Sequence, residues 1–363
     1  MAAPRLEIDL DKIHHNASTL VKRLARRGIS VTGVTKGMLG SAEIAATLLR
    51  AGVEALGDSR IENIEAMRLA HAAASMTLIR SPMLSQVKRV VMQADASCNT
   101  EIEVINKLSI EAQKAKRIHG VILMVELGDL REGIMPGDLT GTVREVLSLP
   151  NIALKGIGTN LACRSGASPD GENMAILSEL ADSVAATHGL TLEIVSGGNS
   201  ANLSWALSGA DIGRINDLRL GEAILLGCET LHRQPIDGLH TDAIKLCAEV
   251  IEAKVKPSRP SGVIAQTAFG EASPVTDRGL VRQAILAVGQ QDIDPGGLIA
   301  PTGIHVMGAS SDHLILESDR FELSVGAEVV FQVNYSALIR AMTSPFVTKV
   351  MTSASTDNLM ISC

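Results

Sequence analysis

The stretch VTGVTKGMLGSAEIAATLLRA, residues 31–51, contains one copy of the pattern that decides the fold. A short apolar run ends at Thr35 and Lys36. Ser41 then stands where a helix N-cap is expected, just before residues with helical spacing. Gly52 follows at the place where such a helix would stop. The stretch is therefore predicted to be a strand followed by a helix.

The same alternation continues to about residue 220. Strands are expected at residues 31–35, 55–58, 76–80, 94–99, 121–127, 154–159, 192–196 and 211–215. Helices are expected at residues 12–26, 42–51, 60–73, 101–115, 139–147, 171–188 and 200–207. Parallel neighbours need long crossover connections, and eight such strands suit a closed (β/α)8 TIM barrel. An open doubly wound sheet is the alternative, but no GxGxxG follows a strand.

The pattern changes after about residue 235, where frequent Pro and Gly divide the chain into short pieces. Strand-like segments lie between them, at residues 281–288, 305–307, 313–316 and 328–333. We therefore expect an α/β barrel domain over residues 1–230 and a mainly β domain over residues 231–350. Residues 351–363 are expected to form a loosely ordered tail.

The composition narrows the classes of function. Of the 363 residues, 46% are hydrophobic and 2% aromatic, and the formal net charge is −7, which argues against a nucleic-acid partner. No apolar run is long enough to cross a bilayer, and the N-terminus lacks an apolar signal segment, so a cytoplasmic protein is expected. The five cysteines lack metal-binding spacing, so we expect free thiols and no metal site.

Active sites of barrels gather at the carboxyl ends of the strands, and polar residues stand at several of these positions. Lys36 follows the first strand, where burial would lower its pKa and make it a competent nucleophile; a surface lysine in a turn is the alternative. Further polar segments follow later strands, at residues 128–131, 158–160, 196–200 and 219–222. The small-residue turn at 196–200 opens a helix and suits a phosphate.

Five segments together make the chain resemble the alanine racemase-like enzymes of pyridoxal-phosphate fold type III, closest to the ornithine racemase branch. They are VTKGMLGSAEIA (34–45), ALGDSRIENI (55–64), LIRSPMLS (78–85), RLGEAILLG (219–227) and GASSDHLILE (308–317). The resemblance covers nearly the whole chain. It implies a barrel followed by a β domain, pyridoxal 5′-phosphate as cofactor, and racemisation of a basic amino acid such as ornithine or lysine.

The resemblance also implies roles for individual residues. Lys36 would carry the cofactor as an internal aldimine and transfer the Cα proton on one face. Arg219 would face the pyridine nitrogen and, because an arginine keeps its proton, leave that nitrogen unprotonated. Arg131 would lie near the phenolic oxygen.

The remaining cofactor contacts implied by the resemblance concern the ring and the phosphate. Asn160 stands where many relatives have a histidine that packs on the ring. Asn199 and Ser200 match an Asn-Ser pair, with Ser200 on the phosphate, and Gly221 and Glu222 would offer backbone N–H groups to it.

This sequence differs from the alanine racemases at the second proton-transfer group, which acts on the opposite face of Cα from Lys36. In alanine racemases a tyrosine from the partner subunit's C-terminal domain serves this face, which implies a homodimer. Here Gln290 falls at that position, and an amide is no base. The alternatives are Asp292, Asp312, His313 and Cys163.

Two other functions remain open from the sequence. Without the usual tyrosine, a lyase or decarboxylase using the same cofactor is possible. A non-catalytic pyridoxal-phosphate-binding protein is the other possibility, although such proteins resemble single barrels and this chain carries a second domain.

Overall fold

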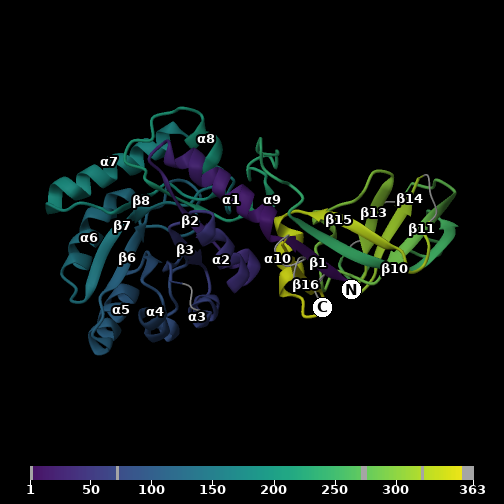
Figure 1. Cartoon of the computed structure of the whole chain (residues 1–363), viewed down its shortest axis with the longest axis horizontal. Coiled ribbons are helices and arrows are strands. Elements are labelled where there is room, and N and C mark those ends of the chain that lie inside the picture. Colours follow the sequence, from purple (N-terminus) through teal and green to yellow (C-terminus); the bar gives the residue numbers. More distant parts are fainter. Residues whose placement is uncertain (1–2, 71–72, 271–275, 320–322, 354–363) are drawn as a thin grey trace, which may run out of the picture. The chain divides into compact units, whose positions relative to one another are not determined.

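The computed structural model describes residues 3–70, 73–270, 276–319 and 323–353 (Figure 1). The chain forms two compact units. One unit is Lys12–Thr241, and the other combines Met1–Asp11 with Asp242–Cys363. Among the described residues, no helix is both long and apolar enough to span a membrane.

The first unit is built on a closed barrel of eight parallel strands, which confirms the predicted architecture. In chain order they are β2 (Ser30–Val34), β3 (Ala55–Asp58), β4 (Ser75–Leu78), β5 (Ala96–Asn99), β6 (His119–Met124), β7 (Ile152–Gly158), β8 (Ile194–Ser196) and β9 (Asp217–Leu220). The last strand pairs with the first, with Gly33 opposite Leu220, and this pairing closes the barrel. All eight carboxyl ends therefore point to one rim.

Helices surround this barrel (Figure 1). They are α1 (Leu10–Ala25), α2 (Ala42–Arg50), α3 (Ile61–Leu69), α4 (Val87–Gln93), α5 (Ile102–Ala115), α6 (Leu139–Leu147), α7 (Gly171–His188), α8 (Leu203–Leu207) and α9 (Glu222–Leu226). Local sequence sets their ends. The Ser41 hydroxyl accepts from the Ile44 N–H at 3.3 Å, and Asp170 forms a capping box at the start of α7. Gly189 ends α7 in the left-handed conformation, with φ of +63°.

The eighth strand lies later in the chain than expected. Residues 211–215 were predicted to be a strand, and this prediction is wrong. Asp211 Oδ1 accepts from the Gly213 N–H at 2.9 Å, and Gly213 has φ of +54°, so this segment turns. The strand itself is DLRL, in which polar and apolar residues alternate, so no apolar run marked it.

The N-terminus also departs from the expected assignment of residues 1–230 to the barrel. Strand β1 (Arg5–Asp9) pairs antiparallel with β10 (Ile244–Pro257) and parallel with β16 (Thr348–Thr352). It therefore belongs to the second unit. Met351 and Thr352, expected in a loose tail, lie in β16, and residues 354–363 of that tail fall outside the described residues.

The second unit is a mainly β structure, as predicted. Its further strands are β11 (Leu280–Leu286), β12 (Leu298–Ile299), β13 (Ile304–Ala309), β14 (Leu314–Ser318) and β15 (Glu328–Val333). The sheet runs in the order β12-β15-β10-β11-β14-β13, and β1 joins it through β10. Fully buried side chains such as Phe331 and Leu246 form its core. One helix, α10 (Tyr335–Thr343), was not predicted; Asn334 caps it by accepting from the Ala337 N–H at 3.0 Å.

Candidate active site at the carboxyl rim of the barrel

Lys36 stands on a short turn fixed to the neighbouring strand. It lies two residues after the end of β2 and opens a 3-10 turn, Lys36–Met38. The preceding Thr35 is buried; its N–H donates to the Gly57 carbonyl at 3.0 Å and its hydroxyl to Asp58 Oδ2 at 2.7 Å. Lys36 is therefore held at the carboxyl rim, as its place after the first strand predicted.

Asp58, at the end of β3, connects this turn to the next helix. Its Oδ1 accepts from the Arg60 N–H at 2.9 Å and from Asn63 Nδ2 at 3.0 Å. Burial raises the pKa of this carboxyl above its ordinary value. Because its oxygens are already taken, Asp58 supports the Lys36 turn and the start of α3.

The environment of Lys36 makes its amine less basic. Removal from water lowers the pKa, Cys163 and Asp58 oppose the shift, and Arg131 and Arg219 add to it. Solvent still reaches the Lys36 side chain, so the amine lies at an open mouth and its desolvation is partial. The lowered pKa increases the share of neutral amine available as a base or nucleophile.

Arg219 lies inside the barrel, on β9. Its guanidinium is buried; Nη1 donates to the Ser196 hydroxyl, and Nη2 donates to the Thr159 carbonyl at 2.6 Å. A Cβ at Gly158 would lie 3.1 Å from the Ser196 Cβ atom, so glycine keeps space beside the residue that Arg219 contacts. The guanidinium is thus fixed in one orientation.

A buried carboxylate, Asp217, completes this polar group. It accepts from the Thr32 hydroxyl at 2.7 Å and from the Ser196 hydroxyl. Asp217 and Arg219 lie two residues apart in one strand, so both face the barrel interior. Sequence reasoning gave Asp217 no site role and named Ser196 only as part of the turn at residues 196–200, not as a partner of Arg219. An alternating polar pair in a buried strand is the signal that could have identified Asp217.

Asn199 contacts the predicted residue Asn160, the neighbouring Leu161 backbone and the thiol of Cys163. Its amide Nδ2 donates to Asn160 Oδ1 at 3.1 Å, to the Leu161 carbonyl at 2.8 Å and to Cys163 Sγ at 3.4 Å. Its Oδ1 accepts from the Ala201 N–H at 2.8 Å and so caps the next turn. The Asn160 Nδ2 atom is buried without a hydrogen-bond partner in the described part of the chain, so one donor in this cluster is unused.

Ser200, Gly221 and Glu222 meet where β8 and β9 end. The Ser200 hydroxyl accepts from the Ala223 N–H at 3.2 Å, at the start of α9. Gly221 lies against Val34; a Cβ there would be 3.1 Å from the Val34 Cβ atom. The Glu222 carboxylate forms an ion pair with Arg233, so the part of Glu222 open to a ligand is its backbone at the helix start.

Arg131 is carried by a tightly folded loop after β6. The Asp129 carboxylate, fully buried, accepts from the backbone N–H groups of Arg164 and Ser165, which ties this loop to the one after β7. Arg131 forms a two-point ion pair with Glu132. Sequence reasoning did not single out Glu132, because nothing in its spacing distinguishes it from a solvated charge.

Of the four alternatives for the second proton-transfer group, Cys163 lies in the same unit as Lys36 and acts on its pKa. The others belong to the second unit. Asp292 is buried and accepts from the Ser344 hydroxyl at 2.7 Å. Asp312 Oδ1 lies 2.8 Å from His313 Nδ1, near the turn that holds Gln290, whose N–H donates to the Ser310 carbonyl at 2.9 Å.

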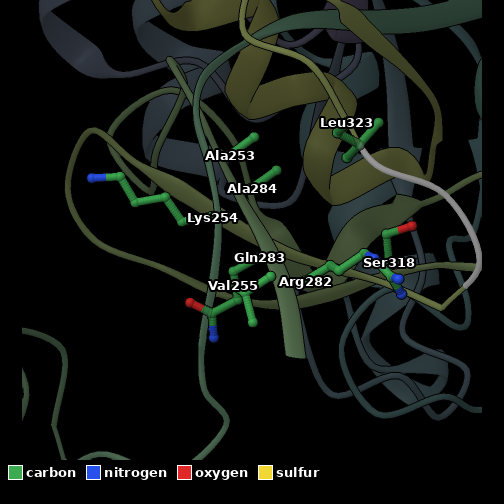
Figure 2. Close-up of a pocket in the computed structure, with 8 residues that line it drawn as sticks. All are labelled: Ala253, Lys254, Val255, Arg282, Gln283, Ala284, Ser318 and Leu323. Carbon is green, nitrogen blue, oxygen red and sulfur yellow. The ribbon is translucent and has the colours of Figure 1, made fainter. Parts of the chain in front are cut away.

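The second unit also has a hollow on its sheet. It is formed by β10 and β11 with Ser318 and Leu323, and Figure 2 shows its lining side chains. The labelled residues include no carboxylate, histidine or cysteine, and the Lys254 amine points away from the other side chains. The hollow therefore lacks the acid–base groups that the barrel rim has.

Comparison with known proteins agrees with this geometry. The N-terminal domain of alanine racemases matches residues 8–227. A lysine racemase of Thermotoga maritima is 40% identical over 96% of this chain and 99% of its own length. An ornithine racemase of Acetoanaerobium sticklandii is 38% identical over 95% of this chain and 99% of its own.

Solved structures show the same fold at lower identity. An alanine racemase from a D-cycloserine-producing Streptomyces lavendulae superimposes with a TM-score of 0.75 at 18% identity, over 97% of this chain and 98% of its own. A D-threonine aldolase from Filomicrobium marinum superimposes with a TM-score of 0.74 at 18% identity, over 94% of this chain and 89% of its own. The domain match and the two full-length relatives show that this chain belongs to the alanine racemase family.

Proposed function

We propose that this protein is a pyridoxal 5′-phosphate-dependent racemase that interconverts the L and D forms of a basic amino acid, lysine or ornithine. The observation that carries the proposal is the Lys36 amine, which has a lowered pKa and stands at the barrel rim near Arg131 and Arg219. The full-length likeness to a lysine racemase and an ornithine racemase supports the substrate class.

The rim residues fit the cofactor chemically. Lys36 offers an amine of reduced basicity, and Asn160 offers a buried donor that lacks a partner among the described residues. The phosphate would be held by the Ser200 hydroxyl and by the backbone N–H groups of Gly221 and Glu222. When bound, the cofactor supplies an electron sink that makes the Cα hydrogen of the substrate acidic.

The remaining contacts concern the ring. Arg219 would face the pyridine nitrogen, and because a guanidinium does not give up its proton, it would leave that atom unprotonated. Ser196 and the Thr159 carbonyl hold Arg219 in place for this role. Arg131 would lie by the phenolic oxygen, and Asn199 would position the loop that carries Asn160.

Racemisation requires a proton-transfer group on each face of Cα. We assign the first face to Lys36, whose lowered pKa favours proton acceptance by the neutral amine. For the second face we choose Cys163, a solvent-exposed thiol that acts on Lys36 and is held by Asn199 Nδ2. A homodimer in the cytoplasm completes the proposal, by analogy with the family.

An absorbance scan of the protein with pyridoxal 5′-phosphate tests the cofactor assignment. The wild-type protein should show the band of a lysine-bound cofactor, and Lys36→Ala should show the spectrum of free aldehyde instead. Lys155→Ala, which removes an exposed lysine paired with Glu193, is the matched control and should keep the wild-type band. A wild-type band in Lys36→Ala would show that another lysine carries the cofactor.

The reaction itself is tested by incubating L-lysine or L-ornithine in deuterated water. A racemase yields the mirror-image amino acid with deuterium at Cα and no other change in mass. A lyase or decarboxylase would instead yield fragments of lower mass.

A further inference from the structure

Among the described residues, several acidic side chains stand near the carboxyl ends of the barrel strands, and six of them lie in or next to the segments that carry Lys36, Arg131, Arg219 and the expected phosphate contacts. They are Asp58, Glu126, Asp129, Glu132, Asp217 and Glu222. A substrate with a cationic side chain needs one of them as a partner, because Lys36, Arg131 and Arg219 otherwise make this mouth positive.

Three of these acids are held by the fold. Asp58 accepts from Thr35, and Asp217 accepts from Thr32 and Ser196. Asp129 binds backbone N–H groups of the neighbouring loop. All three are buried, and removing any of them would leave buried donors unsatisfied.

Two others are engaged by their own loop or by a neighbouring arginine. Glu126 Oε1 accepts from the N–H groups of Gly128, at 2.6 Å, and Leu130, at 3.0 Å, and so folds its own loop. Glu222 is paired with Arg233. Glu126 thus shapes its own loop, and Glu222 is paired with an arginine other than Arg131 and Arg219.

Glu132 differs from the other five. Its side chain is 30% exposed, and the partner it holds is the rim guanidinium of Arg131. The backbone beneath it is rigid: the Glu126 N–H donates to the Ile134 carbonyl at 3.0 Å, and a Cβ on Gly133 would lie 2.4 Å from the Glu126 nitrogen. The loop therefore fixes where this carboxylate stands.

The charge of Glu132 acts on a residue inside the barrel. Cys98, on β5, is buried in an apolar group with Ile122 and Met124. Burial raises the pKa of its thiol to about 11, and among the charges acting on it are Arg219, Asp217 and Glu132. Glu132 is thus close enough to the β5–β6 part of the barrel for its charge to act on a residue there.

We infer that Glu132 determines specificity by receiving the distal ammonium of the substrate. A carboxylate has about four lone-pair directions, and the two-point pair with Arg131 uses two, so an ammonium can join the pair. Glu132 would contribute through the substrate side chain and leave proton transfer at Cα to other groups. This inference rests on the proposed function.

The test compares Glu132→Gln with the wild-type holoenzyme on lysine and on norleucine, a neutral amino acid of similar length. We expect kcat/KM for lysine to fall about 10- to 100-fold, as loss of a charged hydrogen bond gives, while norleucine changes less than about threefold. If norleucine turns over too slowly, its dissociation constant from a spectral titration replaces kcat/KM.

The matched control is Glu145→Gln, which alters an exposed carboxylate on α6. It should leave kcat/KM unchanged for both lysine and norleucine. An equal loss for lysine and norleucine would overturn the inference, because Glu132 would then act only by orienting Arg131. No loss for either would overturn it as well. If the wild-type protein racemises no amino acid, the proposed function fails instead, so the two failures are distinguishable.

Discussion

Thr35 and Asp58 hold the backbone on which Lys36 stands, and Ser196 holds Arg219. These supporting residues are buried, and Thr35 and Asp58 are hydrogen-bonded to each other, whereas Lys36 and Cys163 remain open to solvent. Proton transfer needs reactive groups that are open to the substrate but held by a rigid scaffold, because misplacing an acid or base by a fraction of an ångström lowers the rate.

Cys163 provides the prediction at the scale of the residue. Cys163→Ala should lower the rate of inversion at least about 100-fold, the range given by loss of an acid–base group. Lys36 would still exchange the Cα hydrogen of the enantiomer it faces, so deuterium uptake without inversion is expected, measured by mass spectrometry and chiral chromatography.

Cys228→Ala removes a half-exposed thiol elsewhere in the same unit and should leave both rates unchanged. Inversion at the wild-type rate in Cys163→Ala would exclude the thiol. In that case the Asp312–His313 pair becomes the assignment, which His313→Gln would test.

Some of the rim residues could be predicted from the sequence and others could not. Lys36, Asn199 and Ser200 stand at strand ends, and the structure places them at the same rim. Asp217 was missed, because it lies beyond the segment expected to be the last strand. Glu132 could not be found, since its pairing with Arg131 depends on how the loop after β6 folds back.

At the scale of the element, strands with continuous apolar runs were located to within a few residues. Strand β9 was missed because its polar residues face inward to hold the site, which conflicts with the apolar pattern of a buried parallel strand. Helix α4 was missed because its seven residues are too few to establish helical spacing.

A buried histidine on β6 leads to a prediction of how the stability of the protein depends on pH. His119 on β6 is buried, its Nε2 lies 2.8 Å from the Ser97 hydroxyl on β5, and burial lowers its pKa from 6.5 to about 4. The folded protein therefore binds this proton less readily than the unfolded chain. The resulting stability is complete above about pH 6.5 and is lost as the pH falls toward 4, up to about 3 kcal/mol.

Urea unfolding of wild type and His119→Gln between pH 7.5 and 4.5 measures this effect. The variant should lose less free energy of unfolding over that range, whatever its stability at pH 7.5. Carboxylates also titrate near the acid end, but they are common to both proteins and cancel in the difference. His232→Gln, at an exposed site, should follow the wild-type slope, and equal slopes for all three proteins would contradict the prediction.

At the scale of the whole molecule, the first strand is separated in sequence from its neighbours by most of the chain. In β1, Leu6 lies opposite Leu246 of β10 and Lys349 of β16. No local pattern predicts such a pairing, because it joins segments hundreds of residues apart, and the sequence placed these residues with the barrel instead. The second unit thus needs both ends of the chain to complete its sheet.

Leu6→Ala tests this arrangement. Leu6 is fully buried in the second unit, so the substitution should cost about 2–5 kcal/mol of that unit's stability by leaving a cavity. Amide hydrogen exchange should then accelerate in β1, β10 and β16 while β2 to β9 keep their protection, because the barrel has its own core. Leu280→Ala, on the exposed face of β11, should change neither set of strands. Equal acceleration throughout the barrel strands would instead mean that the two units unfold as one.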